Sequence, residues 1–281
     1  KSGYPFWAIR NGLMHAYPPL ARALRCDVLV VGGGITGALI ADELSRHGHD
    51  VAVIEQRDIG WGSTAASTAL LQYEIDTHLI DLARQYGETA AVQAYQACAD
   101  AIPALREVAR GLKGVDCHPM HSLYYASKRR HRAVLQEEFA LRQRHGFDVR
   151  WLDRDAVQDE FGVDAPGAIL SGLAARVDPY CLTYRLLARL QKNGCQVHDR
   201  TTLATLVPTA RGVTATTAEG KTLVIDEVKD GETLSTTTIT SRNDSESVTF
   251  ETRFKDGRSM VYGTIGHPVL HIAHQTSMKA G

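Results

Sequence analysis

The sequence predicts an α/β protein built in three parts, and three observations carry that prediction. Near the N-terminus, a glycine-rich turn joins a short apolar run to an amphipathic segment and a second apolar run. Segments with the spacing of helices and of strands then alternate, and beyond residue 201 short threonine-rich and apolar runs are separated by turns. These patterns indicate a Rossmann-like domain, an inserted α+β domain and a β-rich C-terminal segment.

Composition narrows the class of protein. Of the 281 residues, 31 are lysine or arginine and 32 are aspartate or glutamate, so the net charge of -1 gives no reason to expect a nucleic-acid partner. The five cysteines contain no CxxC pair, which fits reduced thiols in a cytoplasmic protein. No apolar run approaches the roughly 20 residues that span a bilayer. We therefore expect a cytoplasmic protein without an integral membrane segment, and the sequence assigns no oligomeric state.

The elements of the first domain follow in chain order. Residues 1–25 mix aromatic residues and prolines, which predicts an arm lying across a larger body. The nearly continuous apolar run Cys26–Val31 predicts a strand buried on both faces of a parallel sheet. Apolar residues at helical spacing predict a helix over Gly37–His47, and Asp50–Ile54 predicts a second buried strand. Together these elements make a βαβ unit.

The middle of the chain changes in character. From Asp76 to Leu112 apolar residues recur every three or four positions, which predicts two or more helices with a break near Gly87 and strain at Pro103. An α+β pattern follows, with expected strands at 122–126, 148–152 and 168–177 and expected helices at 128–145 and 155–161. A helix over Cys181–Lys192 and a strand over Cys195–His198 then return the chain to the first domain.

Beyond Thr201 the pattern predicts an antiparallel meander. The pairs Asp230-Gly231 and Asp256-Gly257 are flanked by threonines that alternate with apolar residues, and Asp-Gly is a strong signal for a tight β-hairpin.

A glycine motif carries the clearest functional signal. Gly32, Gly34 and Gly37 have the spacing GxGxxG, directly after an expected strand and at the start of an expected helix. In this setting the first glycine allows a sharp turn, the second lets a pyrophosphate approach the backbone, and the third permits close packing of helix and strand. The helix N-terminus, with Ile35 and Thr36, offers backbone amides and a positive dipole end. The motif predicts a dinucleotide site.

The acid that ends the second strand supports the same site. Glu55 lies about 20 residues beyond the motif, where a carboxylate accepts hydrogen bonds from the adenosine ribose hydroxyls. Glu55 would repel a 2′-phosphate, so NADP is disfavoured although Arg57 is near. An NAD-dependent dehydrogenase would need another βαβ half, which the pattern does not contain. Gln56, next to Glu55, is included in the expected site.

A hydroxyl-rich segment follows in the sequence GWGSTAASTALLQYEIDT. It contains Ser63, Thr64, Ser67 and Thr68 among small residues, at the expected start of a helix. Two interpretations are open. The hydroxyls form a second surface that contacts an anion and a ring system, or they are only the N-cap and polar first turn of that helix.

These motifs resemble those of a known family. GGGITGALIADELSRHGHDVAVIEQRDIGWGSTAASTALLQYEID, with the later GAILSGLAARVDPYCLTYRLL, is similar to the FAD-dependent oxidoreductases of the D-amino-acid oxidase and glycine oxidase type over roughly residues 4–223. The resemblance implies that Gly32, Gly34, Gly37 and Glu55 bind the ADP half of FAD. It also implies that the four hydroxyl residues face the ribityl and flavin side and that Leu203 contacts adenine. The implied activity is hydride transfer from the carbon of an amine or amino acid to flavin N5.

The resemblance also gives expected domains. It implies a discontinuous FAD-binding domain over 1–115 and 180–223 and part of a substrate domain over 116–179, and it leaves 224–281 as an unassigned β-meander. That last region departs from the family, because the alanine-threonine-glycine strand end and the glycine-containing loop that closes over the flavin are not found. The alternative function is therefore a truncated or rearranged flavin-fold protein that acts as a non-enzymatic binding or interaction module.

The remaining candidates have simpler explanations. No catalytic residue is assigned, since hydride transfer to a flavin does not require a protein acid or base. Tyr124 and Tyr125 are candidate substrate contacts, but a tyrosine pair on a strand is more often half-buried packing. Two sets of residues have spacings that suggest a metal site, yet a solvated tail and a plain loop explain them better, so we expect no metal: His267, His271 and His274, and Cys117, His118 and His121.

Overall fold

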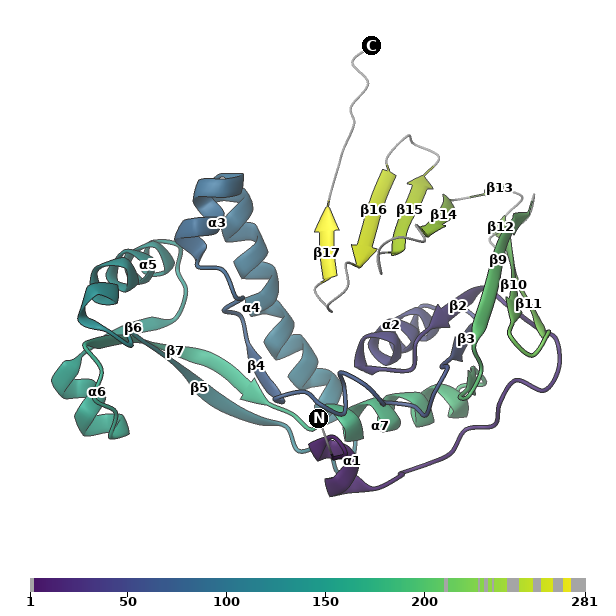
Figure 1. Ribbon diagram of the computed structural model, residues 1–281, viewed down its shortest axis with the longest axis horizontal. Coiled ribbons are helices and arrows are strands. Elements are labelled where there is room, and N and C mark those ends of the chain that lie inside the picture. Colours follow the sequence, from purple (N-terminus) through teal and green to yellow (C-terminus); the bar gives the residue numbers. More distant parts are fainter. Residues whose placement is uncertain are drawn as a thin grey trace, which may run out of the picture. The chain divides into compact units, whose positions relative to one another are not determined.

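The chain folds into two compact units in a computed structural model (Figure 1). The structure describes residues 3–209, 212–226, 228–229, 232–233, 235–241, 248–254, 259–264 and 270–273. Unit 1 comprises Lys1–Gly12 and Thr64–Arg185, and unit 2 comprises Leu13–Ser63 and Leu186–Gly281. This geometric division groups residues 64–115 with the inserted region, whereas the expected FAD-binding domain includes them. The functional domain assignment stays a prediction.

Unit 2 contains the expected βαβ unit. Strand β2 (Val28–Val31), helix α2 (Ile35–Arg46) and strand β3 (Val51–Ile54) follow one another, and β2 and β3 pair in parallel. Strand β8 (Gln196–His198) adds to the other edge of β3, also in parallel, so the sheet order is β2-β3-β8. All four residues of β3 are buried, as its unbroken apolar sequence predicts.

The first expected strand is divided between two sheets. Leu24–Cys26 forms β1, which pairs in parallel with β11, whereas β2 begins only at Val28. Asp27 interrupts the run because its carboxylate accepts a hydrogen bond from the Asp50 backbone N–H at 2.8 Å. Its own N–H donates to the Asp50 carbonyl at 2.9 Å. The prediction of one continuous strand was therefore wrong at Asp27.

The second sheet of unit 2 has the order β1-β11-β10-β9. Its strands β9 (Leu203–Thr209), β10 (Gly212–Thr217) and β11 (Thr222–Asp226) are antiparallel to one another. Its core consists of Leu20, Ile54, Ala215 and Leu223, and Leu203 packs against this cluster. The start of β9 is thereby tied to the end of β3.

The expected antiparallel meander is confirmed for the C-terminal strands that the structure describes. A short hairpin is formed by β12 (Val228–Lys229) and β13 (Glu232–Thr233). A four-stranded antiparallel sheet follows, with the order β14 (Ser235–Ser241), β15 (Val248–Phe254), β16 (Ser259–Thr264) and β17 (Leu270–Ala273). The Asp-Gly pairs at 230–231 and 256–257 lie outside the described residues.

Unit 1 has an antiparallel sheet with β7 (Gly167–Arg176) at its centre. On one edge β7 pairs with β5 (His118–Tyr125), and on the other with β4 (Leu70–Gln72) and β6 (Val149–Asp153). Six helices accompany these strands in chain order: α1 (Phe6–Asn11), α3 (Leu79–Tyr86), α4 (Glu88–Arg110), the 3₁₀-helix η1 (Arg129–His131), α5 (Arg132–Arg144) and α6 (Arg154–Phe161). Helix α7 (Pro179–Lys192) contains the division between the two units. The predicted α+β pattern is present.

The predicted helical region from residue 76 to 112 forms two helices. Helix α3 ends and α4 begins around Gly87, whose φ of +86° favours glycine, so the predicted break is confirmed. Pro103 lies inside α4, which continues through it to Arg110. On one face of α4, Tyr95, Ala99 and Ile102 are buried at helical spacing.

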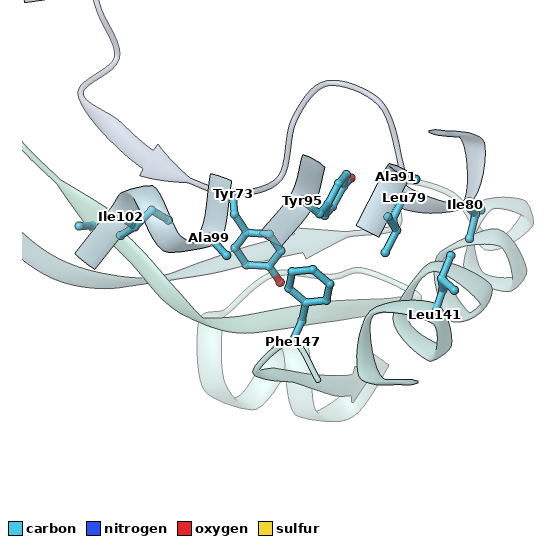
Figure 2. Packing of buried hydrophobic residues seen from close by; sticks show 10 residues of the cluster. Tyr73, Leu79, Ile80, Ala91, Tyr95, Ala99, Ile102, Leu141 and Phe147 are labelled. Carbon is cyan, nitrogen blue, oxygen red and sulfur yellow. The ribbon is translucent and has the colours of Figure 1, made fainter. Parts of the chain in front are cut away.

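The largest part of the unit 1 core lies where α3, α4 and α5 meet the sheet. Figure 2 shows Tyr73 beside Phe147, and their rings stack with centroids 5.2 Å apart. The Tyr95 ring meets Phe147 edge to face at 6.0 Å. Leu79, Ile80 and Leu141 complete the cluster toward α5. This packing fixes the sheet against the helices, and burial of each such side chain stabilises the fold by about 1.5–3 kcal/mol.

Candidate functional site

The glycine motif lies between β2 and α2 in unit 2. Gly32 has a φ of +114°, and its N–H donates to the carbonyl of Ile54 at 2.8 Å, so the turn begins against the end of β3. A Cβ atom on Gly37 would lie 1.9 Å from the Gly32 carbonyl oxygen. Only glycine therefore allows α2 to approach the turn this closely, which is the packing expected of the third glycine in the motif.

Gly33 has a role that the sequence analysis missed. It is buried, and a Cβ atom there would lie 2.2 Å from Ile59 Cδ1. Its carbonyl accepts a hydrogen bond from the N–H of Gly60 at 2.9 Å. The run of three glycines is a signal that could have identified this contact, although the motif itself leaves the middle position open.

The N-terminus of α2 follows directly. Gly34 is its N-cap residue and offers no side chain, and the helix proper begins at Ile35. Ile35 is half-buried and Thr36 is exposed. A helix of 12 residues that begins without a capping side chain or an acidic first turn has a positive dipole end suited to phosphate.

Glu55 is held against the glycine turn. Its side chain is 8% exposed, and Oε2 accepts a hydrogen bond from the Gly33 N–H at 2.9 Å while Oε1 accepts one from the Arg57 N–H at 2.9 Å. Its backbone donates to the His198 carbonyl of β8 and accepts from the Thr201 N–H. Since a carboxylate has about four lone-pair positions, two remain for further donors such as hydroxyls. The bond between Glu55 and Gly33 could not be predicted from the spacing of the motif.

The other expected adenosine contacts belong to the same unit. Gln56 is exposed immediately after Glu55. Leu203 is half-buried at the start of β9. The structure thus brings the glycine turn, the α2 N-terminus, Glu55 and the start of β9 into one compact unit, where the ends of β3 and β8 hold Glu55 by backbone hydrogen bonds.

The hydroxyl segment is not the start of a helix. Turns continue through residue 66, residues 67–69 are irregular, and β4 begins at Leu70. Local bonds explain this conformation, because Ser67 Oγ accepts from the Ala69 N–H at 3.1 Å and Ala69 has a φ of +67°. The Ser67 carbonyl accepts from Trp7 Nε1 at 2.8 Å. The N-cap interpretation was therefore wrong.

The four hydroxyl residues differ in exposure and in unit. Ser63 is exposed and ends a segment of unit 2, whereas Thr64, Ser67 and Thr68 belong to unit 1. Thr64 is buried, with 6% of its surface exposed, and Ser67 and Thr68 are exposed. Their expected role toward a flavin stays a prediction.

Tyr124 and Tyr125 are 40% and 49% exposed, so each side chain is about half-buried, and both line a cavity of unit 1. Their role as substrate contacts stays a prediction. Of the metal candidates, His118 Nε2 lies 2.6 Å from Asp116 Oδ1. Within the described residues there is no group of three or more metal-ligating side chains, and the side chains of His267, His271 and His274 lie outside that part.

The residues around the glycine turn fit the ADP half of a dinucleotide. The backbone contact at Gly37 holds α2 close to the turn, Gly34 gives the helix no side-chain cap, and the Glu55 carboxylate retains lone pairs. These are the features that a pyrophosphate and a ribose require. No helix in the described part of the chain is long and apolar enough to cross a membrane.

The chain is similar in sequence and fold to several known proteins. The chain is 27% identical over 205 residues to gamma-glutamylputrescine oxidoreductase of Escherichia coli (strain K12), which covers 71% of this chain and 47% of that protein. Among solved structures, glycine oxidase from Geobacillus kaustophilus matches with a TM-score of 0.59 at 19% identity, over 88% of this chain and 73% of that one. An L-amino acid deaminase from Proteus vulgaris matches with a TM-score of 0.62 at 15% identity, over 91% and 72% of the two chains.

These matches cover only part of each curated relative. The chain spans less than half the length of the first curated relatives that it matches. The solved structures, at identities below 25%, show the mixed α/β fold. The family model described as DAO, FAD dependent oxidoreductase, matches residues 27–228, which include the glycine turn, Glu55 and the whole sheet of unit 1. The chain therefore belongs to the DAO family of FAD-dependent oxidoreductases.

Proposed function

We propose that this chain binds FAD and oxidises the carbon–nitrogen bond of an amine or amino acid. The observation that carries the proposal is the glycine turn of unit 2, where the Gly37 contact and the Glu55 carboxylate shape a site for ADP. The relatives named as a glycine oxidase and a gamma-glutamylputrescine oxidoreductase support the substrate class.

The residues of unit 2 have distinct parts in this proposal. The backbone amides around Gly34, Ile35 and Thr36 bind the pyrophosphate, helped by the dipole of α2. Glu55 accepts hydrogen bonds from the ribose hydroxyls while it keeps its own bond to Gly33. Gln56 and Leu203 lie at the edge of the adenosine position. Unit 2 thereby serves as the FAD-binding domain.

Unit 1 supplies the substrate side in this proposal. Ser63 at the end of the unit 2 segment and Thr64, Ser67 and Thr68 of unit 1 face the ribityl and flavin part of the cofactor. FAD supplies a hydride acceptor at N5, and the protein orients the substrate carbon and excludes water. No side chain is assigned as acid or base, because this chemistry does not demand one.

The test is anaerobic reduction of the bound flavin. Protein loaded with FAD is mixed without oxygen with glycine, sarcosine, D- and L-amino acids and aliphatic diamines, and the visible flavin absorption is followed. We expect one or a few of these amines to bleach the flavin, whereas matched hydroxy acids leave it oxidised. Bound FAD that no amine reduces would overturn the substrate class and leave the cofactor assignment standing. A protein that takes up no FAD would favour the alternative of a non-enzymatic binding module.

A further inference from the structure

Unit 1 contains a cavity that the proposed reaction does not use. It has a volume of about 440 Å³ and is lined by His78, Tyr124, Tyr125, Ala126, Ser127, His131, Val134 and Leu135. These residues come from the end of β5, the loop and η1 after it, the start of α5 and the residue before α3. All belong to unit 1, and none is among the residues assigned to FAD. Cavities of this size, largely apolar with a few placed polar groups, are typical of small-molecule sites.

One polar group of the cavity is an imidazole–phenol pair. His78 Nε2 lies 2.6 Å from the Tyr124 hydroxyl, and their rings meet edge to face. Asp81 Oδ2 lies 3.7 Å from Nδ1, which favours the tautomer that carries its proton there. Nε2 then accepts a hydrogen bond from the Tyr124 hydroxyl, whose oxygen keeps lone pairs for a ligand donor. Burial raises the pKa of the Tyr124 phenol, so it stays a neutral donor to His78.

A second polar group lies at η1. Arg130 Nε donates to His131 Nε2 at 3.2 Å, so the imidazole proton is on Nδ1. Nδ1 lies 3.2 Å from Ser127 Oγ and donates to it. The Ser127 hydroxyl proton is then directed away from His131. The Ser127 hydroxyl can therefore donate a hydrogen bond to a ligand oxygen.

The residues on either side of His131 in the sequence carry positive charge. Lys128, Arg129, Arg130 and Arg132 flank the lining residue His131 in sequence, and all are exposed. Arg132 lies over the Trp151 ring at 5.8 Å. Arg129 lowers the pKa of Asp164, behind the larger effect of Arg154. Arg130 forms no ion pair within the part of the chain that the structure describes, so its charge is not neutralised locally.

We propose that this cavity binds a small organic anion with a flat apolar body, of the aromatic carboxylate class. The tyrosine and histidine rings with Val134 and Leu135 supply apolar contact for the flat body. The carboxylate lies toward the lining residues Ser127 and His131. Ser127 supplies a hydroxyl donor, and Arg130, which is outside the lining but donates to His131, supplies a nearby positive charge. All of its lining residues belong to unit 1 and none is assigned to FAD, so we expect the cavity to bind its ligand with or without FAD.

Calorimetric titration with naphthoate tests the proposal, with naphthyl methanol as the uncharged probe of similar shape. We expect saturable binding of one naphthoate per chain and binding of the alcohol that is weaker by about tenfold or more, since the alcohol cannot form the charge-assisted hydrogen bond of the carboxylate. Val134→Trp fills the cavity from an exposed position of α5 and should abolish binding. Arg130→Ser should weaken it, whereas Lys113→Ser, an exposed lysine that does not line the cavity, should not.

Three results would overturn the proposal that the cavity binds an aromatic carboxylate. Equal binding of the acid and the alcohol would overturn the assignment of an anion, and naphthoate binding that survives Val134→Trp would place the probe elsewhere and overturn the site. Absence of binding by the wild-type protein would also overturn it. The same titration is run on flavin-free protein, where binding should persist, and flavin content and far-UV circular dichroism of Val134→Trp should match the wild type. Failure of this proposal thus leaves FAD binding untouched, and the reverse also holds.

Discussion

At the scale of single residues, the closest contact of the nucleotide site lies at Gly37. A Cβ atom there would lie 1.9 Å from the Gly32 carbonyl oxygen, so the turn must move to admit one. Gly37→Ala should reduce FAD affinity at least about tenfold, because overpacking of this kind costs about 1–3 kcal/mol and displaces the amides of the turn. Flavin content per chain, with circular dichroism as the measure of folding, tests this.

A matched glycine serves as control for that substitution. Gly111 is exposed and has a φ of -72°, which alanine adopts without strain. Gly111→Ala should keep the flavin content of the wild type. If Gly37→Ala bound FAD as tightly as Gly111→Ala, the turn would not hold the pyrophosphate in the proposed way.

A buried cluster of charges in unit 1 gives a second prediction at this scale. Arg142 Nη2 lies 2.7 Å from Glu138 Oε1, and Arg142 Nη1 lies 3.3 Å from Glu74 Oε1. Glu138 also accepts the N–H groups of Leu79 and Ile80 at 2.9 Å, which caps α3. Glu74 Oε2 is buried and accepts no hydrogen bond in the described part of the chain. One guanidinium therefore faces two carboxylates.

The burial of Glu74 makes stability depend on pH. Burial raises the pKa of Glu74 above its ordinary 4.5, although Arg142 acts in the opposite direction. The folded chain then holds this proton to a higher pH than the unfolded chain, so the contribution of Glu74 to stability is fully present below pH 4.5 and is lost as pH rises through the folded pKa.

Glu74→Gln should remove that loss. At neutral pH we expect the variant to be more stable than the wild type by about 1–2 kcal/mol, with no gain at pH 4. Denaturant unfolding at several pH values measures this, and Glu107→Gln on the exposed face of α4 is the control. The free energy of unfolding of Glu74→Gln could instead change with pH in the same way as that of the wild type. Glu74 would then be ionised in the folded wild-type chain without a loss of stability.

The sequence pattern could not have predicted this cluster. Glu138 and Arg142 are four residues apart in what the pattern describes as an ordinary amphipathic helix, and Glu74 is far from both in the chain. Only the packing of α3 and α5 shows that all three are buried. Likewise Gly32, Gly37 and Glu55 were found from spacing, but the Glu55 bond to Gly33 depends on the way β3 ends beside the turn.

At the scale of elements, an ion pair joins α2 to α7 within unit 2. Arg189 donates from Nε to Asp42 Oδ1 at 2.9 Å and from Nη2 to Oδ2 at 2.7 Å. Asp42 is only 4% exposed, so it depends on this partner for its hydrogen bonds. The pair holds α2, and with it the glycine turn, against the C-terminal part of α7.

Arg189→Met should destabilise unit 2 by about 2 kcal/mol, because it leaves a buried carboxylate unpaired. Thermal or denaturant unfolding measures this change, and flavin content should fall with it. The control is Arg150→Met, which removes an equally bidentate pair with Glu160 at an exposed site of unit 1 and should have a much smaller effect. Equal effects of the two substitutions would mean that the α2–α7 pair does not support the site.

Most helices and strands could be predicted from the sequence, but the points at which a strand is interrupted could not. The spacing of apolar residues located α2, β3, α4, α5 and α7 to within a few residues, since each buries one face. The division of the first strand at Asp27 and the short strand β4 escaped prediction. Both depend on partners distant in the chain, Asp50 for the first and β7 for the second. A sequence pattern shows which face is apolar, and it does not show which strand lies beside it.

At the scale of the whole chain, the residues proposed to bind the ADP half of FAD all belong to one compact unit. Unit 2 contains the glycine turn, the N-terminus of α2, Glu55 and Leu203. The family resemblance could be recognised from the sequence because the glycine motif and Glu55 lie close together in it. The division into two units could not, because residues 64–115 pack against the sheet of unit 1. We therefore expect unit 2 to bind the adenosine half of the cofactor whether or not a substrate is bound.

The measurement that tests this most directly is a titration of purified, flavin-free protein with FAD, followed by the change in flavin fluorescence and by retention of the flavin on a size filter. We predict saturation at one FAD per chain and no comparable binding of NAD. A protein that binds no FAD, or that binds it equally well with alanine at Gly37, would contradict the assignment of the glycine turn as the site of its ADP half.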